Sequence, residues 1–134
     1  MTEPLYLDAS AFLRRVDADD TDAINAIDAV VTRYRESGGR VVSSRLLWLE
    51  ARRVTVRERQ VGNDISGVVE RNLATVDRLP LTEDVWDRAH AIDTHVKTLD
   101  ALHLATCALV GGVLLSFDAQ MRAAAVAMGI PLAT

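Results

Sequence analysis

The sequence is poor in cysteine and in aromatic residues, and each shortage excludes a class of protein. The one cysteine, Cys107, cannot form a disulfide within the chain, so a small fold held together by disulfides is excluded. Cys107 lies in an apolar run, where we expect a buried thiol. Aromatic residues make up 4% of the chain, which argues against binding single-stranded nucleic acid by stacked rings. We expect Trp48 and Trp86 to be core or interface residues.

Long apolar runs and export signals are also lacking. The longest apolar run, residues 104–115, has the length of a buried core element and is too short to span a bilayer. The first ten residues, MTEPLYLDAS, lack the positive start and apolar run of a secretory signal. We therefore expect a cytoplasmic protein without a membrane anchor.

The composition is that of one ordinary globular domain over residues 1–134, with 49% hydrophobic and 25% charged residues. The net charge of −4 argues against a protein that coats nucleic acid. The charges are segregated, however, with six arginines and two glutamates in residues 40–59 and five aspartates without a basic residue in residues 17–28. One face of the fold is therefore expected to be locally positive.

The hydrophobic pattern predicts strands that alternate with helices. Strands are expected at residues 4–8, 40–44 and 113–117, and weaker ones at 75–81 and 130–132. Helices are expected at residues 9–16, 21–36, 45–59, after 63, from 82, from a Thr98 cap through 110, and at 119–128. This order predicts an α/β sandwich with a central parallel sheet flanked by helices. Ligands of such sheets bind beyond the carboxyl ends of the strands, where Asp8 and Asp118 lie.

Four carboxylates are candidates for a shared site. Asp8 and Asp118 each precede a helix, so an N-cap would explain either one alone. Glu50 falls on the helix stripe that is expected to face the core, where a lone charge is costly. Asp100 lies in the first turn of the most apolar helix, whose dipole favours an anion. Together, two strand ends and two helices packed on the sheet point to one acidic pocket.

Clustered carboxylates repel one another unless they share protons or hold a cation. An all-oxygen ligand set favours Mg²⁺ or Mn²⁺ over zinc. A hard cation held in this way activates water for in-line attack on a phosphodiester, so that no side-chain nucleophile is needed.

Other polar residues have weaker claims to a function. The histidines at positions 90, 95 and 103 are too scattered to form a metal site by spacing, and for His103 we expect a structural or hydrogen-bonding role. Arg45, Arg52 and Arg53 lie on or near the helix of Glu50 and are candidates for contacts with RNA phosphates, although a solvated helix face explains them equally well.

Four segments resemble, in order and spacing, the motifs of PIN-domain ribonucleases. They are LDAS at residues 7–10, LE at 49–50, LDALHLA at 99–105 and SFD at 116–118. The nearest branch is similar to the VapC toxins of bacterial type II toxin–antitoxin pairs. The resemblance covers essentially the whole chain, and it implies a PIN-like sandwich of the architecture predicted above.

The resemblance also implies residue roles, with the metal-binding catalytic acids at Asp8, Glu50, Asp100 and Asp118 and with Ser10 and Ser116 orienting them. Some relatives carry a further acid where this chain has Met121 and Arg122, so the resemblance supports one tightly held ion.

The activity implied by the resemblance is a Mg²⁺-dependent endoribonuclease, with Mn²⁺ as a substitute. Its substrate would be an RNA of the translation machinery, a tRNA or rRNA. The protein would arrest growth, form a homodimer and be neutralised by a VapB-like antitoxin.

The principal alternative is a catalytically silent PIN-like domain that binds a protein or a metal, against which the intact set of acids argues. A receiver domain needs paired acids after the first strand and a lysine near the last strand. The chain has a single acid there, and its one lysine is Lys97. An aspartyl phosphatase needs a second aspartate at the position of Ser10. Both phosphoryl-transfer alternatives therefore fit poorly.

Overall fold

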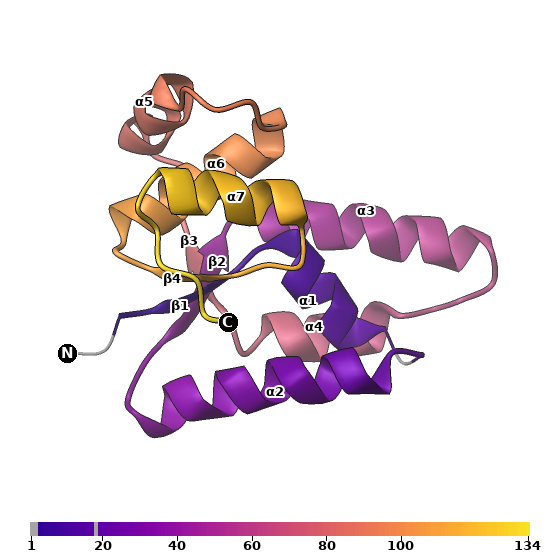
Figure 1. Ribbon diagram of the computed structural model, residues 1–134. Helices are drawn as coiled ribbons and strands as arrows, with labels where there is room; N and C mark the ends of the chain where they lie inside the picture. The colour runs from indigo at the N-terminus through magenta and orange to yellow at the C-terminus, as the bar shows by residue number, and fades with distance from the viewer. Residues whose placement is uncertain (1–2, 18) are drawn as a thin grey trace.

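The computed structural model describes residues 3–17 and 19–134, and within them a four-stranded parallel sheet lies at the centre of the fold (Figure 1). The strands follow the order β3-β2-β1-β4, with bounds β1 (Leu5–Leu7), β2 (Val41–Ser44), β3 (Asp77–Leu79) and β4 (Val113–Leu115). The helices are α1 (Ala9–Val16), α2 (Thr21–Glu36), α3 (Leu46–Gln60), α4 (Ser66–Leu73), α5 (Glu83–Ala91), α6 (Thr98–Leu109) and α7 (Ala119–Ala127). The prediction of a parallel sheet flanked by helices is confirmed.

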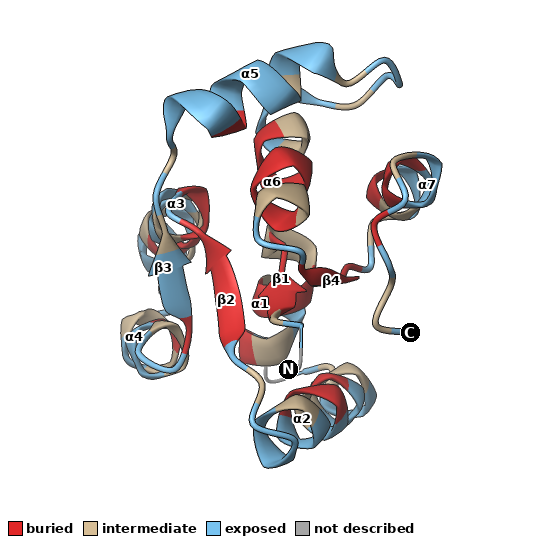
Figure 2. Ribbon diagram, turned by 90° about the vertical axis from the view of Figure 1, so that its left-hand side faces the viewer, coloured by how far each residue is buried: buried red, intermediate tan, exposed pale blue. Residues whose placement is uncertain are grey.

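The central strand β1 is buried on both faces. Leu5 and Leu7 pack with Ile27 of α2 on one face, whereas Tyr6 packs with Leu104 of α6 and Met121 of α7 on the other. Figure 2 shows α2 and α6 on opposite sides of the sheet. Side chains alternate between faces along a strand, so burial on both faces requires the uninterrupted apolar run of β1.

The structure corrects two predictions at the ends of elements. Thr98 was expected to cap α6, but it is the first helical residue, and Lys97 holds the cap position without a side-chain cap bond. The expected strand at residues 130–132 is reduced to one bridge between Leu114 and Leu132. Pro131 has no N–H to donate to the ladder, which explains why this strand does not extend.

Cys107 is fully buried, as predicted. Trp48 is partly buried against two clusters of the core, whereas Trp86 is 50% exposed. Across residues 3–17 and 19–134, the structure contains no helix with the length and apolar character needed to cross a membrane.

Gly112 joins α6 to β4 at a point of close approach. A Cβ atom there would lie 3.1 Å from Cys107 Sγ and 3.4 Å from the carbonyl oxygen of Cys107. We expect Gly112→Ala to lower the free energy of unfolding by about 1–3 kcal/mol, because the buried Cys107 side chain must give way in a packed core. In the control, Gly67→Ala on α4, the Cβ meets only the flexible Arg71 guanidinium, and stability should rise by up to about 1 kcal/mol. Urea denaturation measures both, and equal stability of the two variants would contradict the prediction.

Candidate active site

The strand order brings two of the predicted acids to the same crevice. β1 pairs with β2 on one side and with β4 on the other, so the connections run in opposite directions from β1, and a crevice opens there at the carboxyl edge of the sheet. Leu7 pairs with Leu115, which places Asp8 beside Ser116 and close to Asp118. The sheet register therefore creates the neighbourhood that the strand-end pattern predicted.

A cavity of about 350 Å³ lies at this edge, and all four predicted acids line it. Asp8 and Asp118 come from the strand ends, Glu50 from α3 and Asp100 from the first turn of α6. The other lining residues are Ala9, Ser10, Lys97, Thr98 and Leu99. The structure thus brings together side chains that are up to 110 positions apart, from Asp8 to Asp118.

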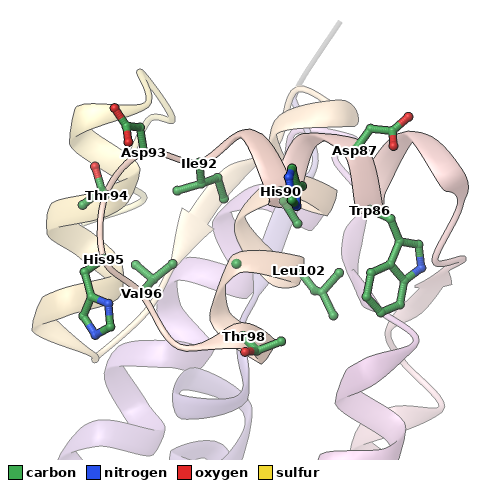
Figure 3. A pocket seen from close by; sticks show the side chains of 12 residues that line it. Trp86, Asp87, His90, Ile92, Asp93, Thr94, His95, Val96, Thr98 and Leu102 are labelled. Carbon is green, nitrogen blue, oxygen red and sulfur yellow. The ribbon is translucent and has the colours of Figure 1, made fainter.

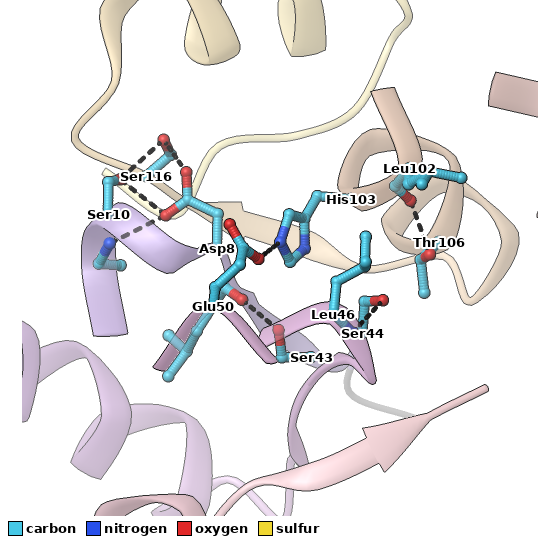
Figure 4. A network of polar contacts seen from close by, with 12 residues as sticks. Asp8, Ser10, Ser43, Ser44, Leu46, Glu50, Leu102, His103, Thr106 and Ser116 are labelled. Carbon is cyan, nitrogen blue, oxygen red and sulfur yellow. Dashed lines mark hydrogen bonds and ion pairs between the residues drawn. The ribbon is translucent and has the colours of Figure 1, made fainter. Parts of the chain in front are cut away.

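The two predicted serines hold the carboxylate of Asp8 (Figure 4). Ser10 Oγ donates to Asp8 Oδ1 at 2.7 Å, and Ser116 Oγ donates to Asp8 Oδ2. Each serine oxygen also accepts a backbone N–H, Ser10 from Phe117 at 2.9 Å and Ser116 from Asp118 at 3.1 Å. The serines therefore tie the two strand ends together around Asp8.

Asp8 and Asp118 are also the N-caps of their helices. Asp8 Oδ1 accepts from the backbone N–H of Ala11 at 2.9 Å, and Asp118 Oδ1 accepts from that of Met121 at 3.0 Å. Capping engages one oxygen of each carboxylate. Asp118 Oδ2 has no hydrogen-bond partner among the residues that the structure describes. Asp118 can therefore cap α7 with one oxygen and present the other to the cavity.

Burial disfavours ionisation of two acids of the cavity, Asp8 and Asp100. Burial raises the pKa of Asp8, against the hydrogen bonds from the serines and α1 that lower it. Burial also raises the pKa of Asp100, and the neighbouring carboxylates of Asp118, Asp8 and Glu50 raise it further. The carboxylates therefore repel one another across the cavity, and a bound cation would relieve that repulsion.

The side-chain atoms available in the cavity determine which metal ion it could hold. Within residues 3–17 and 19–134, no three histidine, cysteine, aspartate or glutamate side chains converge as a ready-made ligand set. Both oxygens of Asp8 are engaged by hydrogen bonds, as is one oxygen each of Asp118 and Glu50. Mg²⁺ needs only one or two carboxylates directly, because it keeps several of its waters. The carboxylate and hydroxyl oxygens of the lining fit a hydrated Mg²⁺ or Mn²⁺.

The position of Glu50 differs from the prediction. Its side chain is 21% exposed, so it lies at the margin of the core and does not point into it. The carboxylate is hydrogen-bonded by His103, whose Nε2 lies 2.6 Å from Oε1. The long-range contact with His103 removes the isolation that made a charge on this stripe costly.

The three arginines predicted to contact phosphates lie on α3 or just before it, as the sequence indicated. Arg45, Arg52 and Arg53 are exposed on α3 or at its start, and none of them lines the cavity, so their contact with phosphates stays a prediction. Lys97 does line the cavity, a position that the sequence reasoning missed. Its closeness to Asp100 in the sequence was the available signal.

A larger cavity, of about 710 Å³, lies between α5 and the start of α6 (Figure 3). Trp86, His90 and His95 are among its lining residues, and it shares Thr98 with the acidic cavity. None of the four predicted acids lines it. The smaller cavity is therefore the better candidate for the active site, since it lies at the carboxyl edge of the sheet.

An acid-lined cavity at the carboxyl edge of a parallel sheet flanked by helices is the arrangement expected of a PIN domain. The chain belongs to the PIN domain family, which its residues 5–127 match. It is 32% identical over 131 residues to Ribonuclease VapC46 of Mycobacterium tuberculosis (strain ATCC 25618 / H37Rv), an alignment that covers 94% of this chain and 93% of that protein. The family predicted from the four motifs is thereby confirmed.

Two solved structures share the fold. A toxin–antitoxin complex from Klebsiella pneumoniae has a TM-score of 0.61 at 19% identity, covering 85% of this chain and 86% of that one. PAE2754 from Pyrobaculum aerophilum has a TM-score of 0.65 at 17% identity, covering 91% of this chain and 79% of that one. These similarities establish the PIN-like architecture.

Proposed function

We propose that this chain is a Mg²⁺-dependent endoribonuclease of the VapC type, a toxin that a VapB-like antitoxin neutralises. The observation that carries the proposal is the gathering of Asp8, Glu50, Asp100 and Asp118 around one cavity. The similarity to Ribonuclease VapC46, which extends over nearly the whole of both chains, supports the same activity.

We assign roles to the acids from the carboxylate oxygens that carry no hydrogen bond. Asp118 Oδ2 and Glu50 Oε2 carry no hydrogen bond within the described part of the chain, so they are available to a hydrated cation. Asp8 is held rigidly by Ser10 and Ser116 and would act through a bound water. When bound, Mg²⁺ would supply an activated water and neutralise charge on the leaving oxygen of the phosphodiester.

The proposed partners are an RNA and an antitoxin. Lys97 in the cavity wall and the exposed Arg45, Arg52 and Arg53 are cationic groups that would contact RNA phosphates. The likeness to a toxin–antitoxin complex from K. pneumoniae supports a protein antitoxin. We further propose that the protein is a cytoplasmic homodimer. Its RNA substrate would be a tRNA or an rRNA.

The test is cleavage of RNA by the purified chain in the presence of Mg²⁺ or Mn²⁺. We expect cleavage to cease when EDTA removes the metal and to return with excess Mg²⁺, because the acids alone cannot activate water or offset phosphate charge. Gel analysis of a labelled RNA measures this. Cleavage that persists in EDTA would contradict the mechanism. A chain that Mg²⁺ stabilises against heat but that cuts no RNA would favour the catalytically silent alternative.

A further inference from the structure

A chain of buried hydrogen bonds runs from the backbone of β2 to the carboxylate of Glu50. The N–H of Ser44 donates to the phenol oxygen of Tyr6 at 3.1 Å, and that oxygen lies 2.7 Å from His103 Nδ1. His103 Nε2 lies 2.6 Å from Glu50 Oε1 (Figure 4). Tyr6 is 0% exposed and His103 is 1% exposed, so water does not compete for the bonds from Ser44 to Tyr6 and from Tyr6 to His103. The chain of bonds connects β2, β1, α6 and α3.

The direction of the first bonds is set by the backbone. An amide N–H can only donate, so the Tyr6 oxygen accepts from Ser44 and its own proton remains to be donated. Burial raises the pKa of Tyr6, which keeps that proton in place. The nearby hydroxyls of Ser43 and Thr106 donate their protons to backbone carbonyl oxygens, at 2.6 Å and 2.7 Å. A hydroxyl oxygen can also accept, but within the described residues the acceptor that hydrogen-bonds the phenol oxygen is His103 Nδ1, at 2.7 Å, so the phenol proton is directed there.

The tautomer of His103 follows from that direction. Because Nδ1 accepts from Tyr6, the ring proton of the neutral imidazole lies on Nε2 and is donated to Glu50 Oε1. The opposite tautomer would set the lone pair of Nε2 against a carboxylate oxygen 2.6 Å away. The rings of Tyr6 and His103 meet edge to face, with centroids 5.8 Å apart and planes at 77°. This packing holds the imidazole in its orientation.

We propose that Tyr6 and His103 are positioning residues for Glu50, an inference that rests on the proposed metal-dependent function. We call the hydrogen bonds from Ser44 through Tyr6 and His103 to Glu50 the relay. Because the relay binds Oε1 of Glu50, it turns Oε2 toward a hydrated cation. The Glu50 side chain is 21% exposed, so without His103 it is free to rotate toward solvent. Hydrogen-bond partners of this kind commonly tune metal affinity. The hydrogen bonds thus link the positions of α6 and α3 beside β2 to the affinity of the acidic cavity for Mg²⁺.

The first test reads the tautomer in the metal-free wild-type chain. With ¹⁵N-labelled histidine, NMR distinguishes a protonated ring nitrogen from an unprotonated one. We expect His103 to show a protonated Nε2 and an unprotonated Nδ1, whereas the exposed His90 and His95 serve as internal references. A protonated Nδ1, with or without a protonated Nε2, would overturn the claim that Nδ1 accepts from Tyr6.

The second test measures Mg²⁺ binding by thermal shift, which does not depend on catalysis. In Tyr6→Phe and His103→Leu, we expect the Mg²⁺ concentration for a half-maximal shift to rise roughly tenfold. His103→Gln keeps an N–H that reaches toward Glu50 and should restore much of the affinity. The control Thr55→Val removes a buried hydroxyl of α3 that bonds only the Ala51 carbonyl, and it should leave the titration unchanged.

The outcomes separate the relay from the proposed function. If the wild type binds Mg²⁺ and the folded Tyr6→Phe and His103→Leu variants bind it equally well, the positioning role is wrong. If the wild type shows no Mg²⁺-induced shift, the proposed function and the metal part of this inference both fail. The ¹⁵N chemical shifts of His103 in the metal-free wild type would still decide the direction of the hydrogen bonds. The same measurement decides it if a variant does not fold.

Discussion

Asp8→Asn is expected to reduce RNA cleavage at least about a hundredfold, the usual loss when one group that stabilises transition-state charge is removed. The variant should stay folded, because the asparagine Oδ1 can still accept from the N–H of Ala11 and from Ser10. What it loses is the negative charge between the two serines. The N-cap and the catalytic role are thereby separated, since only the catalytic role needs a charge.

Cleavage of a labelled RNA at saturating Mg²⁺ measures the effect of Asp8→Asn, with far-UV circular dichroism as the check on folding. Asp87→Asn is the matched control, because Asp87 is an exposed acid of α5 that lines the other cavity. The control should retain wild-type activity. A folded Asp8→Asn variant that cuts as fast as the wild type would remove Asp8 from the mechanism.

The strand ends could be predicted from the sequence because their signals are local. The apolar segment Leu5–Leu7 is followed at once by Asp8, and β4 is followed by the short segment 116–118, which ends in Asp118. Caps and buried strands depend on neighbouring residues in the chain, so a pattern of a few positions is enough to place them. The parallel sheet then brings both aspartates to one edge.

The surroundings of Glu50 could not be predicted in the same way. Helical periodicity places Glu50 on the inner stripe of α3, but its hydrogen-bond partner His103 lies 53 positions away. That pairing depends on how α6 and α3 pack beside β2, which no local pattern encodes. The same applies to Lys97, whose place in the cavity wall depends on where the segment before α6 crosses the sheet edge.

The prediction of one tightly held ion stays untested, but the structure shows what replaces the further acid. Met121 is a buried residue of α7 and packs in the core. Arg122 donates to the carbonyl oxygens of Ser116 at 3.2 Å and Thr134 at 3.0 Å. These two residues therefore hold the C-terminal segment against the β4 end and provide no carboxylate to the cavity.

Asp100→Asn is expected to act in opposite directions on activity and on stability. Cleavage should fall about a hundredfold, as for Asp8, because a charge that would offset the metal is lost. In the metal-free chain, however, the melting temperature should rise. Burial and then the carboxylates of Asp118, Asp8 and Glu50 raise the pKa of Asp100, so its ionised form opposes folding at neutral pH. Asparagine removes that charge.

The sign of the pH dependence identifies the cause of this stabilisation. A carboxyl whose pKa is raised by folding makes the metal-free wild type less stable as the pH rises through that pKa. The melting temperatures of the wild type and Asp100→Asn should therefore converge in acid and separate toward neutral pH. Melting curves in EDTA across this range measure the difference, and a gap that does not change with pH would contradict the electrostatic explanation.

Asp84→Asn is the matched control for Asp100→Asn, because Asp84 also lies in the first turn of its helix but is exposed and away from the acidic cavity. Losing its favourable interaction with the helix dipole should lower stability by about 0.3–1 kcal/mol, the opposite sign to Asp100→Asn. Adding Mg²⁺ should then stabilise the wild type and Asp84→Asn alike, and Asp100→Asn much less. If Mg²⁺ stabilised Asp100→Asn as much as the wild type, Asp100 would be excluded from the metal site. A carboxylate that binds the cation cannot be removed without weakening that stabilisation.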